Sequence, residues 1–218
     1  MSVLIFIDVA DGHVKKASLE VLSYGAKVAS QLGTDAEGVV LGNVSENLAD
    51  LGKYGIKRIH QVSDSSLNHL DAQVYTNVFA QVAQASGAKV IIFSNNVDGK
   101  AIAPRLSARL KAGLVTGAIA LPDTGSGFVV KKSVFSGKAF ANIGISSAKK
   151  IIALNQNSFG LNPTGGTAEV AAFAATIEPH KTEVVSVNKI KGEIPLEQAL
   201  REIIFGIRPF TPKYNHQY

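Results

Sequence analysis

The residues best placed to do chemistry form a polar loop that follows a buried apolar run. The run ends at Phe93, and Ser94-Asn95-Asn96-Val97-Asp98-Gly99-Lys100 leads into a helical pattern. Ligands of open α/β sheets bind at the carboxyl ends of strands, and the free N–H groups of a helix N-terminus favour an anion. The loop therefore predicts a site that faces a partner or a nucleotide. Its candidate residues are Asn95, Asn96, Gly99, Lys100 and Arg105.

The same loop also fits a purely structural interpretation, in which Asp98 caps the helix and Arg105 packs along it.

Two other loops could likewise be either functional or structural. Asp8 and Asp11 follow the first apolar run, where two carboxylates would repel a phosphate unless a metal ion came between them. We expect this loop to be structural or partner-facing, and metal ligation by the two carboxylates is the weaker alternative. The turn at residues 136–138 is either a second ligand loop or a simple hairpin.

Several classes of site are excluded by what the sequence lacks. There is no cysteine, so disulfides, thiolate nucleophiles and cysteine-ligated metals are absent. The glycine-rich phosphate loops G-x-x-x-x-G-K-[ST] and G-x-G-x-x-G are missing, as is the G-x-S-x-G elbow of serine hydrolases. The five histidines show no metal-ligand spacing. We therefore expect no catalytic residue and no metal site.

The positive charge lies in the second part of the chain. Residues 1–130 hold 11 Lys and Arg against 11 Asp and Glu, whereas residues 131–218 hold 11 against 6. Such a cluster indicates either a patch that faces an acidic partner or a water-facing strand surface. Aromatic residues are sparse there, so we expect no nucleic-acid binding. The cluster, within 20 residues that contain no acid, consists of Lys131, Lys132, Lys138, Lys149 and Lys150.

The elements that must position these residues alternate in the first half. Strand-like runs and helical stripes follow one another with short connections, which predicts an α/β fold with a doubly wound, mostly parallel sheet. The expected helices cover 15–31, 46–53 (capped by Ser45), 72–85 (capped by Asp71) and 98–111. The expected strands of this half cover 3–9, 36–41, 58–62 and 88–93.

The second half is mostly β and predicts an added antiparallel portion. Glycine pairs near 125–127 and 136–137 suggest hairpin turns. The expected strands cover 114–121, 127–135, 138–145, 149–154, 169–176 and 183–191. No apolar stretch is long enough to span a bilayer and no signal peptide is visible, so we expect a cytoplasmic protein without membrane insertion.

Several of these segments, in order and spacing, resemble the alpha subunit of electron transfer flavoproteins. The resemblance is strongest where Gly-Lys ends a loop and Pro-Arg follows on the helix, at Gly99-Lys100 and Pro104-Arg105. It continues through Gly113-Leu114-Val115-Thr116-Gly117 and Val134-Phe135-Ser136-Gly137-Lys138-Ala139. The opening Leu4-Ile5-Phe6-Ile7-Asp8 and Tyr54-Gly55 also fit.

The resemblance implies an electron carrier subunit rather than an enzyme. In that family the alpha subunit pairs with a beta subunit in a heterodimer that contains FAD. The heterodimer carries electrons from dehydrogenases to a membrane quinone oxidoreductase, or takes part in electron bifurcation. Its N-terminal domain is similar to the adenine-nucleotide alpha-hydrolase layer, and FAD lies mainly on a second domain. We expect pairing through the β-rich half and the loop at 94–105.

The resemblance also divides the chain. Residues 1–191 correspond to the N-terminal domain, and residues 192–218 to the start of the FAD-binding domain, whose remaining motifs are missing. The expectation is a truncated subunit that binds no FAD by itself. Arg208 matches a phosphate-loop arginine in position only, because the family's Gly-Gly-Arg-Gly is not reproduced. The alternative is a stand-alone module that holds AMP or ATP at the 94–105 loop with the help of Arg105.

Overall fold

The computed structural model describes residues 2–125, 127–182 and 184–187. Residues 1–182 form one compact unit, and every feature described below belongs to it. The helices of that unit are α1 (Lys16–Gln31), α2 (Ala72–Ala85) and α3 (Val97–Leu110). Short 3₁₀ helices at Leu48–Tyr54, Ser65–Asn68 and Phe135–Gly137 connect other elements.

A nine-stranded sheet runs through the unit in the order β11-β5-β4-β1-β6-β10-β7-β8-β9. The first seven strands of that order are parallel, whereas β8 and β9 are antiparallel. The predicted doubly wound sheet with an antiparallel portion is therefore confirmed. The strands are β1 (Ser2–Ile7), β4 (Asp35–Leu41), β5 (Arg58–Val62), β6 (Val90–Ser94), β7 (Gly113–Ala118), β8 (Val129–Val134), β9 (Ala139–Gly144), β10 (Lys150–Leu154) and β11 (Glu169–Ala172). A small ribbon pairs β2 (Val9–Ala10) with β3 (His13–Val14).

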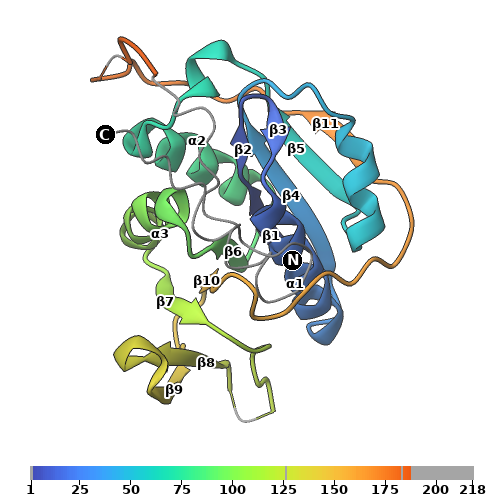
Figure 1. Cartoon of the computed structure of the whole chain (residues 1–218), viewed down its shortest axis with the longest axis vertical. Coiled ribbons are helices and arrows are strands. Elements are labelled where there is room, and N and C mark those ends of the chain that lie inside the picture. Colours follow the sequence, from blue (N-terminus) through green and yellow to red (C-terminus); the bar gives the residue numbers. More distant parts are fainter. Residues whose placement is uncertain (1, 126, 183, 188–218) are drawn as a thin grey trace, which may run out of the picture. The chain divides into compact units, whose positions relative to one another are not determined.

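The sheet is covered by helices on both faces, as Figure 1 shows. Alternate residues of β1 enter two separate cores, because successive strand side chains point to opposite faces. Val3, Ile5 and Ile7 pack toward α1, whereas Leu4 and Phe6 pack toward α2 and α3. Burial on both faces explains why the central strands are continuous apolar runs rather than alternating ones.

One face of α1 anchors the loops that follow β7 and β10. Glu20 is 93% buried, and its carboxylate accepts hydrogen bonds from the backbone N–H groups of residues 157, 159 and 160 at 2.7–3.1 Å. Ser23, three residues later, accepts a hydrogen bond from the Asn162 backbone N–H through its Oγ. Tyr24, four residues later, donates a hydrogen bond from its hydroxyl to the Ala120 carbonyl. Burial raises the pKa of Tyr24, so this hydroxyl stays a donor. Spacing of i, i+3 and i+4 places all three side chains on one face of the helix.

The hairpin of β8 and β9 extends the sheet past the helices. Figure 1 shows it projecting from the end of the sheet beyond α3 and α1. It joins the sheet through the pair Ala118 and Lys132 and through the hydrogen bond from Ile119 N to Lys131 O. Aromatic side chains on it are exposed, namely Phe135 at 79% and Phe140 at 61%.

Two predicted caps and one predicted strand need correction. The segment expected as a helix over 46–53 is a 3₁₀ helix capped by Asn47, because Ser45 Oγ donates instead to the Gly12 carbonyl. Helix α3 is capped by Asn96, whose Oδ1 accepts from Gly99 N, while Asp98 turns to Lys15. The strand expected over 183–191 falls largely outside the described residues, and its described part, 184–187, is not a strand.

Candidate functional site

The crevice in which α/β sheets usually hold a ligand lies here between β1 and β6. The chain runs from β1 outward to β4 and β5, then crosses to β6 on the other side of β1, so this is the topological switch point. Asp8, directly after β1, is buried there and contacts Lys15 Nζ at 3.1 Å. Asn96, in the loop after β6, donates to the other carboxylate oxygen of Asp8 at 2.6 Å. Lys15 also donates to Asp98 at 2.6 Å.

These side chains fill the switch point with an internal ionic network. Burial and the nearby Asp98 charge raise the pKa of Asp8, although Lys15 and Asn96 act in the opposite direction. Burial alone would lower the pKa of Lys15, but its bond to Asp98 and the charge of Asp8 raise it. The space left beside Asp8 is only about 40 Å³, far below the roughly 300 Å³ of a small ligand pocket. The chain therefore occupies its own classical binding position.

A larger cavity lies one crevice farther along the sheet, at the carboxyl ends of β6, β10 and β7. It measures about 690 Å³ and is a depression that is broadly open to solvent. Asn95 follows β6 and Asn155 follows β10, and the Asn95 side-chain amide donates to Asn155 Oδ1 at 2.7 Å. The cavity is lined by Asn95, Lys100, Thr116, Gly117, Lys132, Ser133, Val134, Phe135, Ser136, Gly137 and Asn155.

The backbone around this cavity is irregular on two sides. At Gly117 the register between β7 and β10 shifts, which marks a β-bulge, and its φ of +78° favours glycine. On the opposite wall, Phe135 and Ser136 have φ values of +51° and +53°, although neither is glycine. Backbone strain of this kind costs about 1–3 kcal/mol per residue and concentrates at ligand clamps and interfaces.

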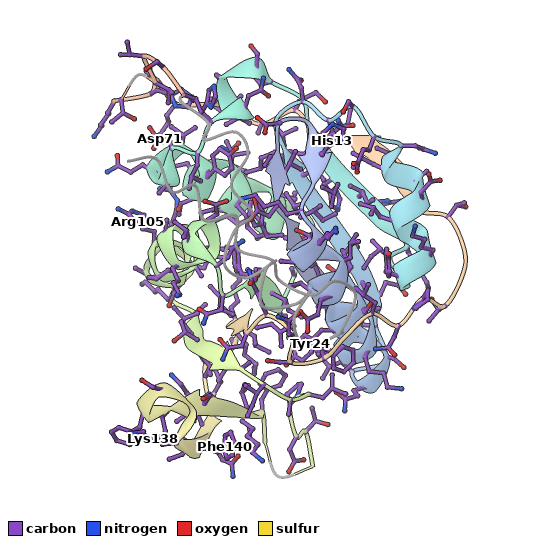
Figure 2. All side chains as sticks on the ribbon, viewed as in Figure 1. His13, Tyr24, Asp71, Arg105, Lys138 and Phe140 are labelled. Carbon is purple, nitrogen blue, oxygen red and sulfur yellow. The ribbon has the colours of Figure 1, made fainter. Side chains whose placement is uncertain are left out.

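The structure separates the five predicted loop residues. Asn95 and Lys100 line the large cavity. Asn96 instead caps α3 and joins the Asp8 network. Gly99 has a packing role, because a Cβ there would lie 1.9 Å from the Ser94 carbonyl oxygen. Arg105 is exposed and donates to the Ala101 carbonyl of its own helix at 2.8 Å, as in the structural alternative (Figure 2). Arg208 lies outside the described residues.

Asn155 is a cavity residue that the sequence analysis did not name, and Thr116 and Lys132 were named there in other roles. A signal for Asn155 existed, because it follows the buried strand β10 just as Asn95 follows β6. No local pattern could place Thr116 and Lys132 beside Asn95, because β10 inserts between β6 and β7 only in the folded sheet. The turn at 136–137 does line the cavity, as its ligand-loop interpretation requires.

The predicted lysine cluster does not form one patch. Lys131 lies over the Phe140 ring at 4.9 Å, whereas Lys132, on the opposite face of β8, lines the cavity. Lys150 donates to the Ser147 carbonyl at 2.8 Å and lies over the Phe128 ring at 5.4 Å. Figure 2 places Lys138 and Phe140 on the projecting hairpin. Alternation along the strand and local contacts divide the lysines.

Metal ligation by Asp8 and Asp11 finds no support in the geometry. Within residues 2–125, 127–182 and 184–187, no three His, Asp or Glu side chains gather in a way that could hold a metal ion. Asp8 already contacts Lys15 and Asn96. The described helices also include none with the length and apolar character needed to cross a membrane.

Comparison with known proteins points to one family. Residues 3–178 match the family described as "Electron transfer flavoprotein domain". The chain is 29% identical over 142 residues to "Electron transfer flavoprotein subunit alpha" of Bacillus subtilis (strain 168), which covers 65% of this chain and 43% of that protein. It is 24% identical over 221 residues to "Protein FixB" of Clostridium saccharobutylicum, covering 99% of this chain and 66% of that protein.

A further alpha subunit, from Syntrophomonas wolfei, is 26% identical over 175 residues, covering 79% of this chain and 54% of that protein. The chain thus spans less than two thirds of the length of each of these relatives. The match lies within the part of the chain that carries the sheet, the Asp8 network and the cavity.

Proposed function

The chain belongs to the electron transfer flavoprotein family, and we propose that it acts as an alpha subunit that pairs with a beta subunit in an FAD-containing heterodimer. That heterodimer carries electrons from dehydrogenases to a quinone oxidoreductase. Two of the relatives described above bear the name of the alpha subunit, which supports this assignment over other roles within the family. We place the domain boundary at residue 191, and the segment 192–218 lies outside the described residues.

The observation that carries the pairing proposal is the uncovered β8–β9 hairpin. Phe140 is 61% exposed on the face of the hairpin that also carries Lys131. Val97, at the start of α3 in the 94–105 loop, is 80% exposed. Exposed aromatic and aliphatic side chains on a projecting element are typical of protein interfaces, where aromatic residues are enriched. The hairpin and this loop are therefore the proposed contacts for the beta subunit.

The described residues do not fit FAD. The space beside Asp8, near the ends of β1 and β4, measures about 40 Å³. The loop after β1 also lacks the glycine-rich turn that lets a backbone approach a pyrophosphate. The larger cavity offers one aromatic side chain, Phe135, which is mostly exposed to solvent. Bound elsewhere in the heterodimer, FAD would supply the electron-carrying chemistry. We propose that this chain by itself binds no flavin and that its own side chains catalyse no reaction.

Co-purification with a beta subunit from the same organism tests the proposal. The unaltered chain should form a complex of one alpha and one beta chain, measured by sedimentation and by titration calorimetry. Phe140→Ser should weaken the complex by about tenfold or more, because aromatic side chains at interface centres often contribute more than 1–2 kcal/mol. Leu161→Ser is the matched control, since Leu161 is 55% exposed and lies on a loop outside the hairpin.

Two results would contradict the proposal at different levels. Absence of any complex with the beta subunit would refute the alpha-subunit role. A complex whose affinity falls equally with Phe140→Ser and with Leu161→Ser would leave the role in place but remove the hairpin as its interface.

A further inference from the structure

The cavity at the carboxyl ends of β6, β10 and β7 is a broadly open depression with a polar and cationic lining. Its volume of about 690 Å³ falls inside the roughly 300–1,000 Å³ range of ligand pockets. Its lining contains two lysines, three hydroxyl side chains and two amides, but no carboxylate. The Asp8 network that fills the neighbouring crevice does not contribute to it.

The two lysines of the cavity have no partner among the residues that the structure describes. Lys100 and Lys132 form no ion pair and no side-chain hydrogen bond with any residue that the structure describes. Other lysines nearby are engaged: Lys15 with Asp8 and Asp98, and Lys150 with the Ser147 carbonyl. Two ammonium groups that no described residue pairs, in a lining without an acidic side chain, favour an anionic ligand.

A hydrogen-bond acceptor in the same cavity that no described residue pairs restricts the chemical class of the ligand further. Asn95 Oδ1 is buried and has no hydrogen-bond partner among the described residues. A buried acceptor left unsatisfied costs about 1–3 kcal/mol, so it favours a ligand that brings a hydrogen-bond donor. A fully ionised phosphate has no donor, whereas a sugar hydroxyl does. Thr116 and Ser133 add hydroxyl groups that can pair with further polar atoms of such a ligand.

We propose that this cavity binds the sugar-phosphate part of a small phosphate ester, either a free sugar phosphate or a nucleoside monophosphate. Lys100 and Lys132 hold the phosphate, and Asn95 accepts a hydrogen bond from a sugar hydroxyl. Phe135 and Ser136, which both have positive φ values, also line the cavity. Lys100 and Lys132 test this site, whereas Phe140 tests the proposed pairing with a beta subunit, so the two proposals can fail separately.

Adjacent lysines of β8 provide a matched pair of variants. Lys132 lines the cavity, whereas Lys131 points to the other face and lies over the Phe140 ring. The unaltered chain is titrated by calorimetry with ribose 5-phosphate, AMP, adenosine and inorganic phosphate. Ribose 5-phosphate or AMP should bind with a Kd below about 1 mM. Lys132→Gln and Lys100→Gln should each weaken that binding about tenfold or more, and Lys131→Gln should leave it unchanged.

The four probes separate the sources of the ligand. AMP binding much more tightly than ribose 5-phosphate identifies a nucleotide, and equal binding identifies the sugar phosphate alone. Asn95→Ala should weaken ribose 5-phosphate relative to inorganic phosphate, a ratio that a general loss of fold would not change. The Asn95 assignment fails if that ratio stays constant.

Three results would overturn the proposal as a whole. The first is no saturable binding of either phosphate ester at 5 mM, roughly fivefold above the expected Kd. The second is equal weakening by Lys131→Gln and Lys132→Gln, which would indicate only diffuse attraction by positive charge. The third is adenosine binding as tightly as AMP, because the phosphate would then contribute nothing. None of these results affects the test of pairing, which depends on Phe140.

Discussion

Replacing Glu20 tests how the fold holds the loop that follows β10. This carboxylate accepts three backbone hydrogen bonds, from Asn157 at 2.8 Å, Phe159 at 2.7 Å and Gly160 at 3.1 Å. Hydrogen bonds to charged groups contribute about 1.5–3 kcal/mol each, so the simple sum for three is roughly 5–9 kcal/mol. Residues 157 and 160 are exposed, however, and their N–H groups can turn to water after the carboxylate is lost.

We therefore expect Glu20→Ala to lower the free energy of unfolding by about 3 kcal/mol, which for a chain of this size is a Tm decrease of roughly 6–12 °C. Glu20→Gln should cost less, because its remaining oxygen can still accept from Phe159 and Gly160. It faces the Asn157 N–H with an NH₂ group, so some loss remains. Urea unfolding followed by circular dichroism gives the free energies, and thermal melts give the Tm values.

Ser23→Ala provides the comparison on the same face of α1. It removes one neutral acceptor, used by Asn162 N at 3.1 Å, and should cost about 1 kcal/mol. The reasoning is refuted if Glu20→Ala costs no more than Ser23→Ala, since the carboxylate would then not anchor the loop. Because Asn155 begins this loop, Glu20→Ala should also weaken phosphate-ester binding in the cavity.

Three further predictions concern single positions. Gly99→Ala should destabilise the chain by about 3 kcal/mol or more, because a Cβ would lie 1.9 Å from the Ser94 carbonyl oxygen. Gly144→Ala is the control: a Cβ there meets nothing within 4 Å, and the free energy of unfolding should change by less than about 0.5 kcal/mol. Asp71→Ala should cost about 1 kcal/mol in urea unfolding, and Asp71→Asn less, because asparagine still caps α2. Burial acts to raise the pKa of Asp71, but hydrogen bonds from the first turn of α2 hold this pKa below its ordinary value of 3.8. The stabilisation by the Asp71 carboxylate is therefore present above pH 3.8 and is lost as the pH falls through the lowered pKa. In a pH series, the loss of stability at acid pH should differ between wild type and Asp71→Ala. Because the pKa of Asp8 is raised, the stabilisation from its protonated form is complete below pH 3.8 and is lost as the pH rises through the raised pKa. The free energy of unfolding of Asp8→Asn relative to wild type should therefore increase from pH 4 to 7. A constant difference would contradict the raised pKa.

The fold was predictable because its strongest signals are local. Continuous apolar runs identified the central strands, and 3.6-residue periodicity identified α1, α2 and α3 within one or two residues of their observed ends. Asp71 was predicted as the cap of α2 and is the cap. The caps that failed share one cause. Ser45 and Asp98 have long-range partners, the Gly12 carbonyl and Lys15, which no local pattern reveals.

The site was predictable only in part because its residues meet across the sheet. Asn95 and Lys100 were found because they follow a buried strand, which is a local property. Lys132 reaches the same cavity only after β10 has entered the sheet between β6 and β7 and the hairpin has folded beside β7. Gly99 and Asn96 also have contacts within the chain that no local pattern reveals. A Cβ at Gly99 would meet the Ser94 carbonyl oxygen, and Asn96 donates to Asp8.

Strand insertion also explains why the open cavity lies where it does. In a doubly wound sheet the switch point between β1 and β6 offers the natural crevice, and here Asp8, Lys15 and Asn96 close it. The insertion of β10 separates β7 from β6. The bulge at Gly117 and the antiparallel hairpin then border an open space beside Asn155. In the β8–β9 hairpin, Lys132 of β8 lines that space, whereas Lys131 of β8 lies over the ring of the exposed Phe140 of β9. Side-chain alternation along β8 separates the two lysines, which is why the Phe140 and Lys132 variants can separate the two proposals.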